Sequence, residues 1–125
     1  MKSIYLSLCI FLSLICNIAI AETPLNQPKS FIFIRPEDCS PHPFFDEFQG
    51  ALQAAALDLG DKLEIRCAND DQYEMVELIK DIANAPQKPD AVIFMAMRNN
   101  GQRVLEQLEK FQIKSFIVNA GLTNE

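Results

Sequence analysis

Strand-like and helix-like segments alternate along most of this chain. Four short segments rich in apolar, β-branched and aromatic residues predict strands over 31–34, 62–67, 91–97 and 115–118. Three segments between them carry apolar residues at helical spacing and predict helices from about Phe44 to Leu59, from Asp71 to before Pro86, and from Asn99 or Asn100 to about Phe111. Such alternation with short connections predicts an α/β fold with a parallel sheet covered by helices on both faces.

The strand segments differ in pattern, and the difference predicts their order. Segment 62–67 alternates polar and apolar residues, which suits a half-covered edge strand, whereas 31–34 and 91–97 are continuously apolar and suit central strands. We therefore expect a doubly wound sheet of order 2-1-3-4. In such sheets ligands bind at the carboxyl ends of the strands, near the switch point between strands 1 and 3.

The helix segments also carry end signals. Gly60 suits a left-handed stop after the first helix. Asp71 with Glu74 resembles a capping box, and Asn99 or Asn100 can cap the third helix. The apolar stripe expected to face the sheet from the first helix consists of Phe45, Phe48, Leu52, Ala55, Ala56 and Leu59.

The amino terminus has the layout of a secretory signal peptide. Lys2 precedes an apolar run over 4–16, and Ala19 and Ala21 occupy the −3 and −1 positions of a cleavage site. The alternative is a membrane anchor, but the run is shorter than the roughly 20 residues that cross a bilayer. We expect cleavage after Ala21, a leader over 22–30, a folded part over 31–125 and a periplasmic location.

Export changes how the cysteines are interpreted. Cys39 and Cys67 remain after cleavage, and both follow the ends of adjacent predicted strands. An even pair in an oxidising compartment favours a disulfide, with two free thiols as the alternative.

Several chemistries find little support in the sequence. It contains no nucleophile elbow, Walker loop or dinucleotide-binding glycine motif, and its net charge of −6 disfavours nucleic acid. His42 is the sole histidine, and the ligand-rich segment 37–42 lacks the paired spacing of a zinc site. A phosphorylated receiver needs an aspartate where Met97 ends the third strand. We expect no enzyme activity, no cofactor and no metal.

Aromatic and polar residues at the strand ends suit a ligand with both hydroxyl groups and apolar C–H faces, such as a sugar. The candidates for ligand contact are His42, Phe44, Phe45, Arg98, Asn99 and Asn119. Each has a structural alternative: one phenylalanine starts the core stripe, Asn99 caps a helix and Arg98 balances acidic neighbours.

Three motifs resemble the amino-terminal lobe of periplasmic sugar-binding proteins of the ribose-binding type: His42-Pro43-Phe44-Phe45, Asp58-Leu59-Gly60 and Phe116-Ile117-Val118-Asn119. The resemblance covers about 31–125. It implies an exported module that binds a carbohydrate-like ligand as the substrate-binding component of an ABC transporter, with a membrane permease as partner. The alternative is an exported sensor that presents its ligand to a membrane sensor kinase.

The resemblance also assigns roles to individual residues. It implies that Phe44 and Phe45 pack against the sugar ring, and that His42 stands where the family often has asparagine. Asn119 and Ala120 stand where the family has an Asp-Arg pair, so ribose itself is not implied. Members have two lobes, and 31–125 holds one. The apolar last strand agrees with a truncated chain or with a second chain that covers this edge.

Overall fold

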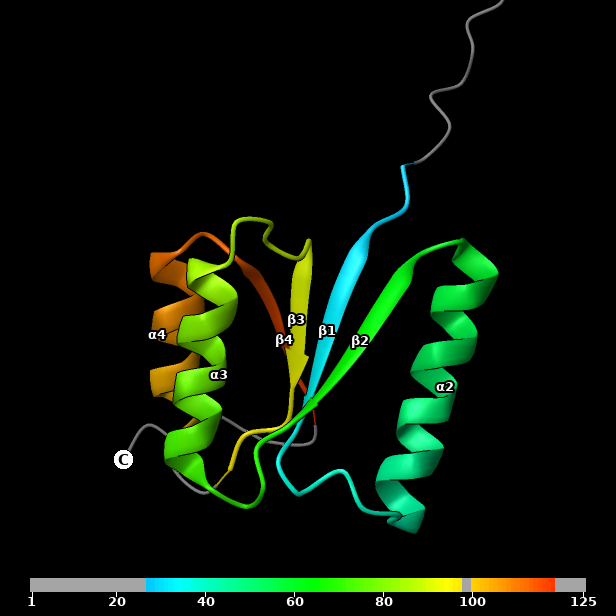
Figure 1. The fold of residues 1–125 in the computed structure, drawn as a ribbon, viewed down its shortest axis with the longest axis horizontal. Coiled ribbons are helices and arrows are strands. Elements are labelled where there is room, and N and C mark those ends of the chain that lie inside the picture. Colours follow the sequence, from blue (N-terminus) through cyan, green and yellow to red (C-terminus); the bar gives the residue numbers. More distant parts are fainter. Residues whose placement is uncertain (1–26, 98–99, 119–125) are drawn as a thin grey trace, which may run out of the picture.

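The computed structural model describes residues 27–97 and 100–118. Strands and helices alternate along the chain, as predicted (Figure 1). The elements are β1 (Ser30–Arg35), α2 (Pro43–Leu59), β2 (Lys62–Cys67), α3 (Gln72–Asn84), β3 (Ala91–Phe94), α4 (Gly101–Lys110) and β4 (Lys114–Ile117). None of the helices in these ranges is long and apolar enough to cross a membrane.

The four strands form one parallel sheet in the order β2-β1-β3-β4, which confirms the predicted order. Phe33 in the middle of β1 lies opposite Ile65 on one side and Ile93 on the other. The chain leaves β1 in one direction for β2 and then returns past β1 to β3. Right-handed crossovers in opposite directions place their helices on opposite faces.

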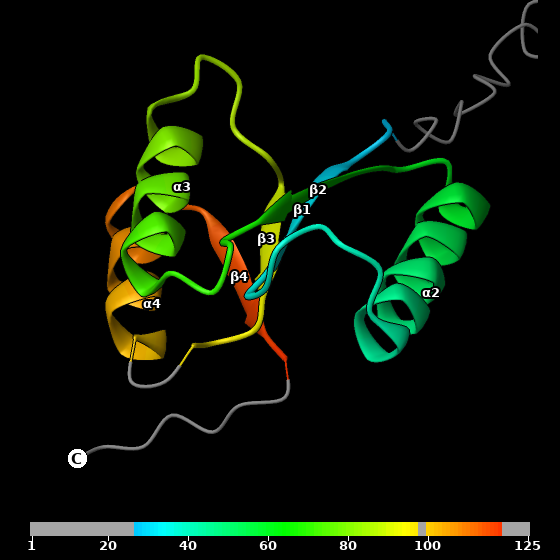
Figure 2. The same cartoon turned by 60° about the horizontal axis from the view of Figure 1, so that its bottom comes forward.

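One face of the sheet is covered by two helices. Figures 1 and 2 show α3 and α4 side by side on this face, with α2 alone on the other. The larger hydrophobic core lies between the sheet and the helix pair, and several of its side chains have no exposed surface. Its largest fully buried members are Ile34, Met75, Ile79, Val92, Phe94, Val104 and Leu108, with Ile82 at 1% exposure.

The face under α2 has a smaller core. Phe33, Phe45 and Met95 are buried there, and Phe48 and Leu52 are partly buried against them. The predicted apolar stripe of α2 is wrong in its second half, because Ala55 is exposed and Leu59 is 74% exposed. Within the described chain α2 is the only helix on this face, so nothing encloses its last turn from the side.

The start of α3 follows only part of the predicted capping box. The Asp71 carboxylate accepts hydrogen bonds from the backbone N–H groups of Tyr73 (2.7 Å) and Glu74 (3.4 Å), as a capping residue does. The Glu74 side chain accepts instead from the Asn69 amide at 2.7 Å. Asp71 therefore caps the helix without the reciprocal bond.

The third strand is shorter than predicted, and the reason lies in Asn100. Beyond Phe94 the chain turns, and the Met97 N–H donates to the Asn100 side-chain oxygen at 3.0 Å instead of to a neighbouring strand. The buried Asn100 amide also donates to the sulfur of Met75. Asn100 stands at the N-cap position of α4, as predicted, but its side chain makes no capping hydrogen bond. Asn99 lies outside the described residues.

Candidate functional site

The candidate site lies at the carboxyl edge of the sheet, where the strand order reverses between β1 and β3. The segment after β1 is held against the segment after β2 by backbone hydrogen bonds. Ala68 N–H donates to the Arg35 carbonyl at 2.9 Å, and Asp70 N–H donates to the Pro36 carbonyl at 2.9 Å. The segments that follow β1 and β2 therefore lie side by side at this edge of the sheet.

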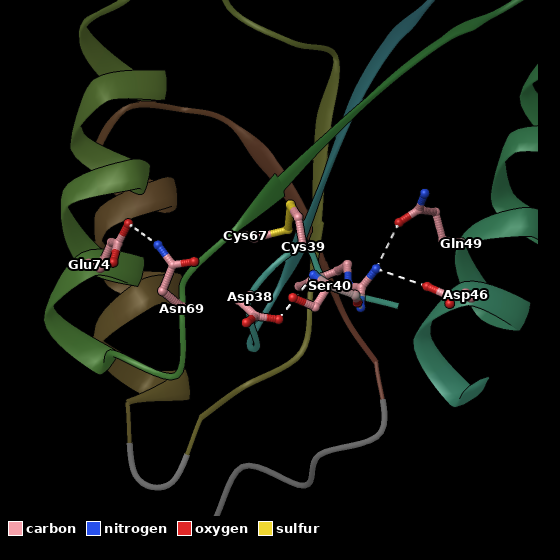
Figure 3. Close-up of a disulfide and its surroundings, with 9 residues drawn as sticks. Asp38, Cys39, Ser40, Asp46, Gln49, Cys67, Asn69 and Glu74 are labelled. Carbon is pink, nitrogen blue, oxygen red and sulfur yellow. Dashed lines mark hydrogen bonds and ion pairs between the residues drawn. A yellow bond between two sulfur atoms is a disulfide. The ribbon is translucent and has the colours of Figure 1, made fainter. Parts of the chain in front are cut away.

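A disulfide adds a covalent link at the same place. Cys39, in the segment between β1 and α2, is bonded to Cys67 at the end of β2, with a Cα–Cα distance of 5.6 Å (Figure 3). The Asp38 carboxylate beside it accepts from the Ser40 N–H at 3.0 Å. The expected pairing of the two cysteines is therefore present in the structure, and it shortens the free length of the β1–α2 segment.

Three of the predicted contact residues form a connected group at the start of α2. The ring centroid of Phe45 lies 5.1 Å from that of His42 and 5.2 Å from that of Phe44. We call His42, Phe44 and Phe45 the aromatic rim. Its members differ in access: Phe45 is 7% exposed, Phe44 is 47% exposed, and the His42 side chain is 45% exposed.

The exposures assign different roles to the two phenylalanines. Phe45 packs into the core with Phe33 and Met95, so it is the phenylalanine that begins the core stripe. Phe44 keeps nearly half its surface in contact with solvent and has a free ring surface for a ligand. The His42 imidazole packs against the Phe45 ring, and its Nε2 lies 3.9 Å from the Glu37 carboxylate, so a hydrogen-bonding group lies next to the phenylalanine ring.

Arg35 was not among the predicted site residues, yet it lies directly behind the aromatic rim. Its side chain is 3% exposed, and its guanidinium carbon lies 5.2 Å from the ring centroid of Phe45. An arginine that ends an apolar strand is a sequence signal that could have drawn attention to it, because a buried charge needs partners. Asp46 and Gln49, three positions apart on α2, supply two of them.

The remaining predicted contact residues, Arg98, Asn99 and Asn119, lie outside the described residues. A cavity of about 270 Å³ lies at the start of α3, lined by Asp70, Asp71, Gln72, Tyr73 and Met97. Among the described residues, no group of three or more His, Cys, Asp or Glu side chains could hold a metal ion.

Two solved structures share this architecture. A periplasmic sugar-binding protein from Pseudomonas fluorescens matches with a TM-score of 0.68 and 29% identity over 77% of this chain. The periplasmic binding protein component of the arabinose ABC transporter from Shewanella sp. ANA-3, bound to α- and β-L-arabinofuranose, matches with a TM-score of 0.61 and 21% identity over 77% of this chain. The fold is that of one lobe of a periplasmic sugar-binding protein.

The extent of the match agrees with a single lobe. The chain covers 29% of the length of the Pseudomonas protein and 31% of that of the Shewanella protein. No protein-family model matches the sequence, and no curated protein matches it significantly. The structural match confirms the resemblance seen in the sequence and the predicted fold class.

Proposed function

We propose that this protein is an exported solute-binding module for a carbohydrate-like ligand, in the manner of the substrate-binding component of an ABC transporter. The observation that carries the proposal is the structural match of 77% of this chain to a periplasmic sugar-binding protein. The aromatic rim at the carboxyl edge of that sheet supports it, because ligands of open α/β sheets bind at this edge.

The chemistry of the aromatic rim suits a sugar. The half-exposed ring of Phe44 offers an apolar surface to the C–H face of a pyranose or furanose. The His42 imidazole, also about half exposed, offers a hydrogen-bonding group to a hydroxyl. Phe45 supports the other two from the core. Arg98, Asn99 and Asn119 complete the proposed set of polar contacts.

We also propose that residues 1–21 are a cleaved signal peptide and 22–30 a leader, which would deliver the lobe to the periplasm. A periplasmic location agrees with the disulfide and with the location named for both matched structures. Transport would then require a membrane permease as partner.

One lobe by itself encloses only one side of a ligand, so the lobe alone should bind weakly. We expect a dissociation constant in the millimolar range, or about −4 kcal/mol of binding free energy. Isothermal titration calorimetry of the chain from residue 22 onward, against a panel that includes L-arabinose and D-ribose, measures it. The absence of binding to every sugar at tens of millimolar would contradict the proposal.

A pair of matched variants tests the site. Replacement of Phe44 by alanine removes the proposed stacking surface and should weaken binding about 2- to 12-fold, the equivalent of 0.5–1.5 kcal/mol. Leu57→Ala is the control, because Leu57 is 81% exposed and lies near the carboxyl end of α2, at the opposite end of that helix from the aromatic rim. Equal losses of affinity in the two variants would show that Phe44 is not part of the site.

A further inference from the structure

The residue with the most connections behind the aromatic rim is Arg35, at the carboxyl end of β1. Its Nη1 donates to the Asp46 carboxylate at 3.2 Å and to the Gln49 side-chain oxygen at 3.3 Å, as the dashed lines to these residues in Figure 3 mark. Its Nη2 donates to the Ser40 carbonyl at 3.1 Å. One side chain therefore joins the strand end, the β1–α2 segment and the first two turns of α2.

The partners of Arg35 hold the aromatic rim directly. Asp46 uses its second carboxylate oxygen to accept the His42 N–H at 2.9 Å, and its own N–H donates to the His42 carbonyl at 2.8 Å. Phe45 lies against the guanidinium on one side and against the rings of His42 and Phe44 on others. Each rim residue thus contacts Arg35 or a direct partner of Arg35.

Burial makes this arrangement specific to arginine. The guanidinium is almost completely withdrawn from solvent, so its charge is compensated by Asp46 and by the neutral acceptors around it. Its planar fork donates to three acceptors and also lies over the Phe45 ring, whereas a lysine ammonium group could not make all of these contacts at once. Arg66, on β2, offers a contrast: it is 29% exposed and pairs with Glu64 on the same strand.

We propose that Arg35 is a positioning residue of the aromatic rim, which holds His42, Phe44 and Phe45 in the one arrangement that can receive a ligand. The inference rests on the proposed function, since it assigns a role in the same site. It predicts that loss of the guanidinium disorders the rim locally while the rest of the sheet keeps its stability. Ligand contact itself remains with the exposed members of the rim.

Amide hydrogen exchange tests the positioning role without any ligand. In Arg35→Met the exchange of the His42 amide should accelerate about tenfold or more, the size expected for loss of charged hydrogen bonds. The reference is the Lys62 amide, which donates to the Lys29 carbonyl at 2.7 Å at the opposite end of the sheet and should change little. Equal acceleration of both amides, or no change at His42, would overturn the proposal.

Two further variants keep the test informative if Arg35→Met folds poorly. Arg35→Lys retains the positive charge but not the planar guanidinium. The exchange rate of its His42 amide should therefore lie between the rates in Arg35→Met and in the unaltered protein. Arg66→Met removes one partly exposed arginine from the neighbouring strand and should leave the His42 amide unchanged. A His42 rate in Arg35→Lys equal to that of the unaltered protein would also count against the proposal.

Binding separates this inference from the proposed function. If the unaltered chain binds L-arabinose or D-ribose, Arg35→Met should weaken that affinity about tenfold, and Arg66→Met should not. Unchanged affinity in Arg35→Met would overturn the positioning role. If the unaltered chain binds no sugar, the proposed function fails, and the exchange rates still decide whether Arg35 orders the rim.

Discussion

Asp90 joins the amino ends of the two central strands. Its carboxylate accepts the Ser30 N–H at 2.7 Å and the Ser30 hydroxyl at 3.3 Å, and its own N–H donates to the Ser30 carbonyl at 2.7 Å. The backbone hydrogen bond from Ser30 is the main cause that lowers the pKa of Asp90 below its ordinary value, with the Ser30 hydroxyl and the charges of Lys29 and Lys114 as smaller causes.

This pKa direction predicts a pH dependence of stability. Because the folded chain has the lower pKa, the contribution of Asp90 is complete above about pH 4 and is lost as the pH falls through the folded-state value. Asp90→Ala should therefore lower the melting temperature at pH 7, and the difference from the unaltered protein should shrink towards pH 2.

Thermal unfolding followed by circular dichroism at several pH values measures this difference. Asp81→Ala, at an exposed position of α3, controls for the loss of one carboxylate at an exposed site. A difference between Asp90→Ala and the unaltered chain that stays constant from pH 7 to pH 2 would contradict the assigned role.

At the scale of elements, two glycines of α2 offer a matched pair. Gly60 ends the helix with φ of 72°, and its N–H donates to carbonyls of the last turn. Gly50 lies inside the helix, and a methyl group added at either glycine would meet no atom within 4 Å. An alanine at either position should therefore change the free energy of unfolding through backbone conformation and not through new contacts.

The two substitutions should act in opposite directions. Gly60→Ala forces a β-carbon into the left-handed region and should lower the free energy of unfolding by about 1–2 kcal/mol. Gly50→Ala should raise it by up to about 1 kcal/mol, because alanine loses less backbone entropy in a helix. Urea denaturation measures both, and equal signs would contradict the assigned ends of α2.

Element order and strand order could be predicted because they follow from periodicity and turn residues. Segment 62–67 showed an edge strand by its alternation, and Gly60 marked a helix end. The end of β3 could not be predicted, because it depends on a hydrogen bond between Met97 and the side chain of Asn100. That hydrogen bond forms in a local turn, and the continuous apolar run over 91–97 gives no sign of the turn.

The proximity of three candidate contact residues could be predicted from the sequence. Their place after a strand end points to His42, Phe44 and Phe45, and the structure places the three rings together. The role of Arg35 was missed, since it arises from partners five to fourteen positions away that meet only after α2 folds back. The sequence also could not decide which phenylalanine is buried, because adjacent residues point about 100° apart on a helix.

At the scale of the whole molecule, the two faces of the sheet differ in cover. The face under α3 and α4 has many side chains without exposed surface, whereas the face under α2 leaves Leu59 and Phe116 more than half exposed. The apolar spacing along α2 predicts a face that packs on the sheet, but it does not show how much of that face is covered, because the cover depends on the topology.

Leucine and isoleucine truncations on the two faces should show this asymmetry. Ile82→Ala, in a side chain that is 1% exposed on α3, should lower the free energy of unfolding by about 2–5 kcal/mol. Leu59→Ala, in the last turn of α2, should change it by less than about 0.5 kcal/mol. Chemical denaturation of the two variants checks this, and a similar loss in both would show that Leu59 is covered in solution.

The claim on which the account depends is that the carboxyl edge of this sheet binds a sugar through the aromatic rim. Titration of the isotope-labelled chain with L-arabinose, followed by nuclear magnetic resonance, tests it residue by residue at millimolar affinity. The account predicts saturable shifts at His42, Phe44 and the segment after β1, with none at Lys29 or Lys62 at the amino ends of the strands. Shifts that cluster at the amino ends, or no saturable shift for any sugar of the panel, would contradict it.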